Sequence, residues 1–203
     1  ALEVAEIDPP KPEANQVIVR VRAVGLNFLD TLMTRGKYQF KPPLPFSPGG
    51  EIAGEVLAIG SDVQGYAVGD KVCAFVSWGG AREQMAVDAG TVIKMPEGVD
   101  DVTAAGISVT YGTAMHGLRD RGRLQSGETV AVLGASGGAG LAAVEIAKLM
   151  GARVIAAASS AEKLDVCQQH GADDVLNYSE TDVKEGLRAL TDGRGVDVIY
   201  DCV

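Results

Sequence analysis

Histidine and cysteine, the residues that most often build metal and redox sites, are scarce in this sequence. Only two histidines and three cysteines occur among 203 residues. The cysteines are Cys73, Cys167 and Cys202, an odd and widely spaced set that contains no Cys-x-x-Cys pair. This pattern argues against a disulfide framework and favours reduced thiols in the core. We therefore expect a cytoplasmic protein.

Positive charge is also in short supply. The chain has 18 lysines and arginines against 27 acidic residues, which gives a net charge of −9. Nucleic acids and anionic membranes both attract basic surfaces, so neither is an expected partner. No apolar run is long enough to span a bilayer. No signal peptide is visible, although a start at Ala1 rather than Met leaves room for a leader or a first strand ahead of it.

The stretch from Thr129 to Ser160 is the most informative part of the chain. An apolar run at 129–133 predicts a strand buried on both faces. A turn of small residues follows at 134–140, and apolar spacing from residue 141 to 149 then predicts an amphipathic helix that Gly151 ends. A second apolar run, 154–158, completes a strand–helix–strand unit.

The turn within this unit matches a dinucleotide-binding fingerprint, Ala135-x-Gly137-x-x-Gly140, with alanine in the first glycine slot. The second glycine lets the backbone approach a pyrophosphate, and the third lets helix and strand pack closely. Free amides at the helix start would receive the phosphates. The alternative is a turn that serves packing alone, and a P-loop is excluded because no Lys-Ser/Thr follows. The expected cofactor-binding residues are Ala135, Ser136, Gly137, Gly138, Ala139 and Gly140.

The two halves of the chain differ in pattern. Short strands separated by glycine turns up to about residue 106 suggest a small β-barrel, and 100–118 predicts a linking helical stretch. After Ser160 the sequence predicts helices at 161–170 and 180–190 and strands at 174–176 and 196–201. This gives four parallel strands, whereas a complete doubly wound sheet usually has six, so we interpret the chain as a fragment.

Several segments together resemble a known family, and they are Val24–Thr31, Pro43–Phe46, Gly49–Gly60, Val68–Val72 and Gly127–Lys148. The chain resembles the medium-chain dehydrogenase/reductase superfamily, specifically its zinc-free quinone oxidoreductase branch, which includes zeta-crystallin. The resemblance implies an α/β architecture: a GroES-like β-barrel catalytic domain at 1–107, then a truncated, four-stranded Rossmann dinucleotide-binding domain at 108–203. It also implies that the full-length protein is a homodimer.

The resemblance allows a test for the catalytic zinc of related enzymes. The usual cysteine ligand position holds Asn27 and the usual histidine position holds Gly50. Glu51, which follows, is expected to be a hydrogen-bonding core residue. His116 falls on the linking helix and His170 at a helix end, where a histidine more often interacts with the helix dipole than with a metal. No metal site is expected.

The end of the second strand of the dinucleotide unit bears on cofactor choice. NAD enzymes usually carry a carboxylate there for the ribose 2′-hydroxyl, but this chain has Ser159 and Ser160, with Lys163 one turn on. Tyr178 follows the third strand, where family members place a residue near the adenosine phosphate. The pattern favours NADPH over NADH. The alternative is that Ser160 caps the next helix and Lys163 is a solvated side chain.

Three further residues are candidates for the reacting end of the site. Asn27 could hydrogen-bond the acceptor carbonyl or the nicotinamide, or could act only as a helix cap. Tyr38 lies at a family position for a cleft tyrosine and could donate a proton, or could pack on the proline-rich loop. A second family tyrosine position holds Leu32. Thr110 resembles the threonine that contacts the nicotinamide amide.

The sequence therefore predicts an enzyme that transfers hydride from NADPH to a small-molecule quinone or α,β-unsaturated carbonyl without zinc. One alternative is an enoyl reductase of the kind embedded in polyketide synthases. Another is a non-catalytic nucleotide-binding relative that keeps the fold. The phosphate turn fits all three, whereas Asn27 and Tyr38 would distinguish an enzyme from a binding protein.

Overall fold

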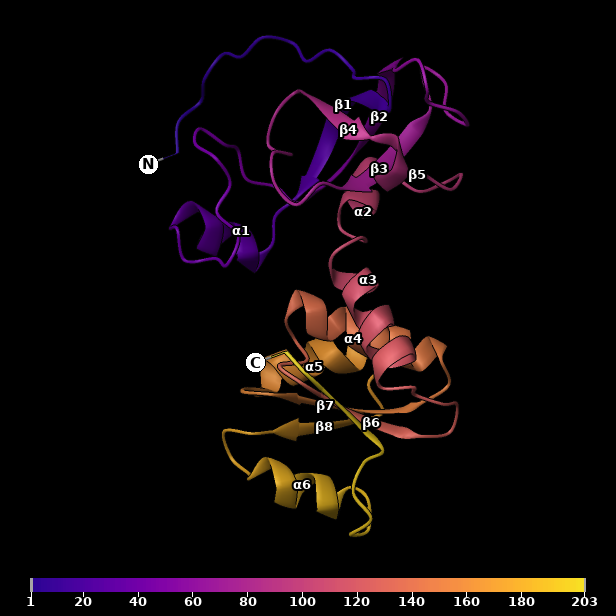
Figure 1. The fold of residues 1–203 in the computed structure, drawn as a ribbon. Helices are drawn as coiled ribbons and strands as arrows, with labels where there is room; N and C mark the ends of the chain where they lie inside the picture. Colours follow the sequence, from indigo (N-terminus) through magenta and orange to yellow (C-terminus); the bar gives the residue numbers. More distant parts are fainter. Residues whose placement is uncertain (1, 203) are drawn as a thin grey trace. The chain divides into compact units, whose positions relative to one another are not determined.

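The computed structural model describes residues 2–202 and divides into two compact units, Ala1–Val109 and Thr110–Val203 (Figure 1). Each unit has its own sheet and its own hydrophobic core. None of the helices in the described part of the chain is both long enough and apolar enough to cross a membrane.

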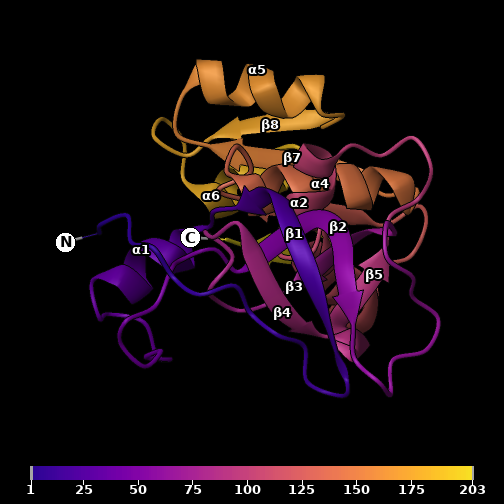
Figure 2. The same cartoon turned by 90° about the horizontal axis from the view of Figure 1, so that it is seen from above.

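The first unit is built on a five-stranded antiparallel sheet with the order β4-β1-β2-β3-β5 (Figure 2). Its edges are β4 and β5, which do not pair with each other within residues 2–202. The strands are β1 (Gln16–Gly25), β2 (Glu51–Ile59), β3 (Lys71–Phe75), β4 (Gln84–Asp88) and β5 (Val92–Lys94). A 3-10 turn, η1 (Ala89–Thr91), joins the last two.

The two faces of this sheet are covered differently. Alternate residues of β1 and β2, such as Val17, Val19 and Ile52, bury their side chains in the main core of the unit. The opposite face packs Ala53 and Cys73 against the short helix α2 (Asp101–Ala105). Asp100 caps that helix, because its Oδ1 accepts a hydrogen bond from Thr103 N at 2.8 Å.

Gly54 marks an unusually close approach of β2 to β1. The pairing register shifts between Val21 and Ala23, which is the signature of a β-bulge. A Cβ atom added at residue 54 would lie 1.9 Å from the carbonyl oxygen of Arg20. The absence of a side chain at residue 54 therefore permits this bulge.

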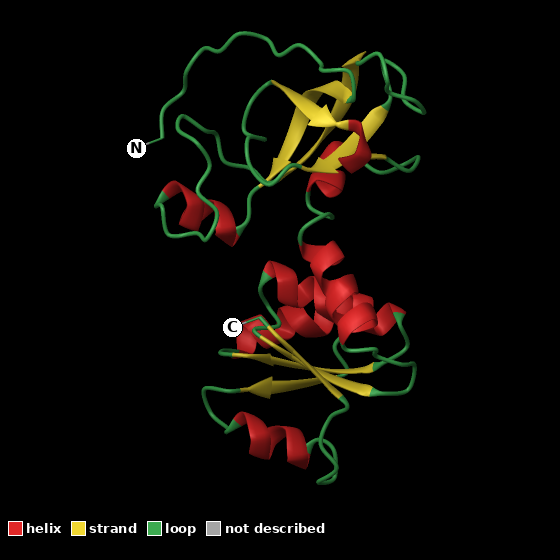
Figure 3. Cartoon of the chain, in the orientation of Figure 1, coloured by secondary structure: helices red, strands yellow, loops and turns green. Residues whose placement is uncertain are grey.

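The second unit has a four-stranded parallel sheet with the order β8-β7-β6-β9, the 3-2-1-4 arrangement of a doubly wound fold. Figure 3 shows its strands in yellow and its helices in red. Its strands are β6 (Thr129–Leu133), β7 (Arg153–Ala158), β8 (Asp174–Asn177) and β9 (Val198–Asp201). Helices α4 (Gly138–Leu149) and α5 (Ala161–Gln169) cover one face, and α6 (Val183–Ala189) covers the other (Figure 1). The predicted fold class is confirmed.

The predicted linking helix over 100–118 is not continuous. Helix α2 ends at Ala105, residues 106–109 are not in a regular α-helix, and α3 (Thr110–Met115) then begins. A π-helical turn, η2 (His116–Arg121), follows α3 and closes with a hydrogen bond from Gly122 N to Gly117 O. Non-local contacts account for both differences: Val109 N donates to the buried Glu51 carboxylate, and the Tyr200 ring of β9 lies against Gly117.

Candidate functional site

The turn between β6 and α4 has the geometry of a phosphate-binding loop. Ala135 is fully buried, and Gly137 occupies the N-cap position with an extended backbone and no side chain to cap the helix. Gly137 and Gly138 are exposed, whereas Ser136 and Ala139 are half-buried. The backbone at the helix start is therefore open on the side where a ligand would approach.

The first amides of α4 have no acceptor within their own helix. The first helical hydrogen bond runs from Leu141 N to Gly137 O at 2.8 Å, so the N–H groups of Gly138, Ala139 and Gly140 precede the helical ladder. Gly140 is buried, and a Cβ atom there would lie 2.4 Å from Gly134 O. These features fit a dinucleotide pyrophosphate, whose charge the positive end of the helix would stabilise.

Hydroxyl and ammonium groups gather at the ends of β7 and β8. Lys163 Nζ donates to Ser159 Oγ at 3.0 Å, and Ser179 Oγ donates to the Ser159 carbonyl at 2.9 Å. Ser160 occupies the N-cap position of α5, but its side chain makes no capping hydrogen bond. Tyr178 is exposed directly after β8. The group offers hydroxyl and ammonium donors, and no carboxylate stands at residues 159 and 160.

Asn27 begins α1 (Phe28–Thr34), and two buried carboxylates hold it. Its side-chain Nδ2 donates to Glu51 Oε1 at 2.9 Å. Its backbone N–H donates to Asp30 Oδ2 at 2.8 Å, and Asp30 Oδ1 accepts a second hydrogen bond from Gly49 N. The expectation that Glu51 is a hydrogen-bonding core residue is confirmed. No local pattern indicated that Glu51 pairs with Asn27, which lies 24 positions away.

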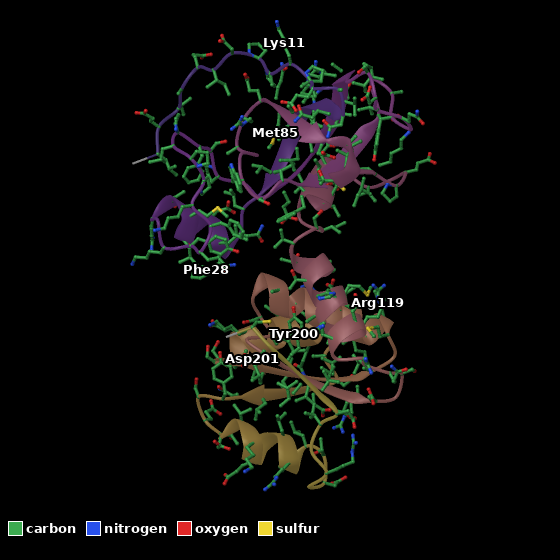
Figure 4. The ribbon with its side chains drawn as sticks, in the orientation of Figure 1. Lys11, Phe28, Met85, Arg119, Tyr200 and Asp201 are labelled. Carbon is green, nitrogen blue, oxygen red and sulfur yellow. The ribbon has the colours of Figure 1, made fainter. Side chains whose placement is uncertain are left out.

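The other two reacting-end candidates lie in different units. Tyr38 is half-buried in the loop that joins α1 to β2, within the first unit. Thr110 opens α3 in the second unit, and its Cγ2 would be 3.7 Å from a Cβ atom added at Gly138. Phe28, the first residue of α1, follows Asn27 in the sequence and is 78% exposed. Figure 4 shows its side chain on α1. Its aromatic side chain was not singled out from the sequence.

The histidines pair with carboxylates. His116 Nδ1 lies 3.1 Å from Asp120 Oδ2, and His170 Nδ1 contacts Glu145, which also accepts a hydrogen bond from Tyr111. Burial works to raise the pKa of Glu145, but the hydrogen bonds from Tyr111 and His170 prevail and lower it. Within residues 2–202, no three histidine, cysteine, aspartate or glutamate side chains converge to form a candidate metal site.

Two of the three thiols are core groups. Cys73 and Cys167 are buried, and burial raises the pKa of each, which keeps them protonated and unreactive. Cys202 is exposed. None of the three is disulfide-bonded in the structure.

Comparisons with known proteins agree with this geometry. Residues 13–97 match the family described as "Alcohol dehydrogenase GroES-like domain", and residues 138–203 match the family described as "Zinc-binding dehydrogenase". Among curated proteins, Quinone oxidoreductase-like protein 2 of Rattus norvegicus is 41% identical over 203 residues, which is 100% of this chain and 58% of that protein. The chain thus spans somewhat more than half the length of this relative.

Solved structures show the same relationship. Escherichia coli quinone oxidoreductase, crystallised with NADPH, is 32% identical with a TM-score of 0.88 over 97% of this chain and 60% of that one. The CurK enoyl reductase is 33% identical with a TM-score of 0.87 over 96% of this chain and 61% of that one. The chain belongs to the quinone oxidoreductase branch of the medium-chain dehydrogenase/reductase superfamily.

Proposed function

We propose that the protein is an NADPH-dependent reductase of quinones or α,β-unsaturated carbonyls that works without zinc. The observation that carries the proposal is the open glycine turn at the start of α4, combined with the donors after β7, where Ser159 and Ser160 stand in place of a carboxylate. Residues 1–107 would hold the acceptor and residues 108–203 the cofactor. The full-length protein would be a homodimer, which light scattering can test.

The cofactor assignment follows from the donors of the second unit. The amides of Gly138, Ala139 and Gly140 would bind the pyrophosphate. Lys163 and Ser159, which are already hydrogen-bonded to each other, would bind the 2′-phosphate together with Ser160 and Tyr178. The related Escherichia coli enzyme was crystallised with NADPH, which supports this choice.

At the reacting end, the acceptor has to be oriented and protonated, and neither step requires a metal ion. The cofactor, when bound, supplies the hydride. A quinone or an enone is already electron-poor, so a hydrogen bond can stabilise the charge that develops on its oxygen. Asn27 would donate that hydrogen bond or orient the nicotinamide, with Thr110 at the carboxamide. Tyr38 would donate the proton to the reduced oxygen.

Zinc independence is part of the proposal and rests on the donor chemistry at the family's ligand positions. Asn27 and Gly50 offer no thiolate or imidazole. Glu51, the neighbouring carboxylate, has both oxygens occupied by hydrogen bonds from Asn27 and Val109. A zinc ion would have to displace these donors to use Glu51.

An enoyl reductase is the second candidate, favoured by the likeness to the CurK enoyl reductase. Both candidates need the same cofactor turn and differ in the acceptor. The test is NADPH oxidation by the full-length protein with 1,4-benzoquinone and, separately, with a crotonyl-pantetheine thioester. Turnover of the quinone supports the first candidate, and turnover of the thioester alone supports the second. Cofactor binding without turnover of any acceptor would indicate a non-catalytic relative.

Variants connect the residues to their proposed roles. We expect Lys163→Ala to weaken NADPH binding about tenfold, equivalent to about 1.4 kcal/mol, and to leave NADH binding within about twofold. Lys184→Ala, at an exposed position of α6, is the matched control.

Asn27→Ala and Tyr38→Phe should lower kcat. Unchanged turnover in both would contradict the mechanistic assignment, and tighter binding of NADH than NADPH would contradict the cofactor assignment.

A further inference from the structure

Glu51 is a charged residue that the structure buries almost completely. Its side chain lies at the start of β2 with 2% of the residue exposed. Both carboxylate oxygens are used: Oε1 accepts from Asn27 Nδ2 at 2.9 Å and Oε2 accepts from Val109 N at 2.8 Å. A buried carboxylate is costly unless such donors meet it, so this arrangement needs both partners.

The first unit is shaped to admit this carboxylate. A Cβ atom added at Gly25 would lie 2.5 Å from Glu51 Cγ and 2.3 Å from the carbonyl oxygen of Ala105. Only glycine at residue 25 therefore allows the end of β1, the Glu51 side chain and the end of α2 to come together.

The carboxylate of Glu51 determines which end of the Asn27 side-chain amide points toward it. An ionised carboxylate only accepts hydrogen bonds, so the nitrogen of Asn27, rather than its oxygen, must point toward it. The backbone of Asn27 is fixed at the same time by Asp30. The second N–H of the Asn27 amide is thereby the group that can be donated to a ligand.

We propose that Glu51 is a positioning residue, which orients the Asn27 amide for the acceptor. This inference rests on the proposed function of Asn27. Glu51 itself would not touch the substrate, because both its oxygens are committed inside the protein.

Glu51→Gln is the informative substitution, since an amide cannot accept from Asn27 and Val109 through two separate oxygens. In the full-length enzyme with 1,4-benzoquinone, we expect kcat to fall about 10- to 100-fold and the KM for NADPH to stay within about threefold. Glu55→Gln, on the same strand but half-exposed beside Arg20 and Arg22, is the matched control and should retain wild-type kcat.

A double-mutant cycle separates positioning from general stability. If Glu51 acts through Asn27, then Asn27→Ala combined with Glu51→Gln should have a kcat within about twofold of Asn27→Ala alone. Effects that multiply would overturn the proposal, because they would show that Glu51 acts independently of Asn27. Unchanged kcat in Glu51→Gln would overturn it as well.

A second double-mutant cycle measures thermal stability and does not depend on turnover. Asn27→Asp places two carboxylates together and should lower the melting temperature. Adding Glu51→Gln should recover at least half of that loss, because its amide can donate to the new carboxylate and its oxygen can still accept from Val109 N. No recovery would overturn the inference. A wild-type protein without quinone turnover would instead refute the proposed function, while this cycle still decides whether Glu51 orients residue 27.

Discussion

At residue 140 the fold depends on a missing side chain. A Cβ atom there would lie 2.4 Å from Gly134 O and 2.7 Å from Ala135 Cα, so Gly140→Ala must push α4 away from the turn. We expect a loss of about 1–3 kcal/mol in the free energy of unfolding and at least a tenfold loss of NADPH affinity. Chemical denaturation and fluorescence titration of the full-length protein would measure the two effects.

Gly138→Ala is the matched control for stability. A Cβ atom at residue 138 would meet only Thr110 Cγ2, at an ordinary 3.7 Å, and alanine favours a helix more than glycine does. Its melting temperature should equal or exceed that of the wild type. If the two alanine variants melted alike, crowding at residue 140 would not be what requires glycine.

At the residue scale, features made by neighbours in the sequence could be predicted, whereas contacts between residues far apart in the sequence could not. Gly140 was predicted from spacing alone, since the fingerprint and its strand and helix are contiguous. The pairing of Glu51 with Asn27 could not be, because only the folded sheet brings β2 to the start of α1. Asn27 was predicted either to cap a helix or to face a ligand, and the structure adds that its side-chain nitrogen is held by Glu51.

At the scale of the elements, the carboxylate of Asp197 links the start of β6 to the start of β9. Asp197 Oδ2 accepts from Thr129 N at 2.8 Å, and Arg194 donates to both oxygens. These hydrogen bonds, with Arg194 the larger contributor, lower the pKa of Asp197 to about 2. A lowered pKa contributes stability that is complete above the unfolded value of 3.8 and disappears as the pH falls toward 2.

We therefore expect Asp197→Asn to flatten the fall of melting temperature between about pH 4 and pH 2, and to lower the melting temperature at pH 7. Asp165→Asn, at an exposed position of α5, should follow the wild-type pH profile and serves as control. Differential scanning calorimetry across this range is the measurement. Parallel pH profiles for Asp197→Asn and the wild type would contradict this account.

Strands with continuous apolar runs were the easiest elements to predict. The run at 129–133 coincides with β6, because a buried parallel strand needs apolar residues on both faces. The linking stretch was predicted wrongly as one helical segment. Its composition favours helix, but the hydrogen bond from Val109 to Glu51 and the contact of Tyr200 with Gly117 come from residues far away in the sequence.

For the whole molecule, cofactor binding should appear as stabilisation. A ligand that binds only the folded state raises the free energy of unfolding by about 2.7 kcal/mol at a hundred times its Kd. We expect NADPH to raise the melting temperature of the full-length protein more than an equal concentration of NADH does. Scanning fluorimetry would measure both shifts, and Lys163→Ala should remove the difference between them. Equal shifts in the wild type would argue against recognition of the 2′-phosphate.

The bulge opposite Gly54 has a consequence for how this sequence can change over evolution or in the laboratory. With the Arg20 carbonyl only 1.9 Å from where a Cβ atom would stand, no side chain can be introduced at residue 54 while β1 keeps its present path. Natural or directed evolution of β2 must therefore keep glycine at residue 54, unless β1 is straightened first. Strand β1, which ends shortly before Asn27, and strand β2, which begins at Glu51, can therefore be redesigned only together.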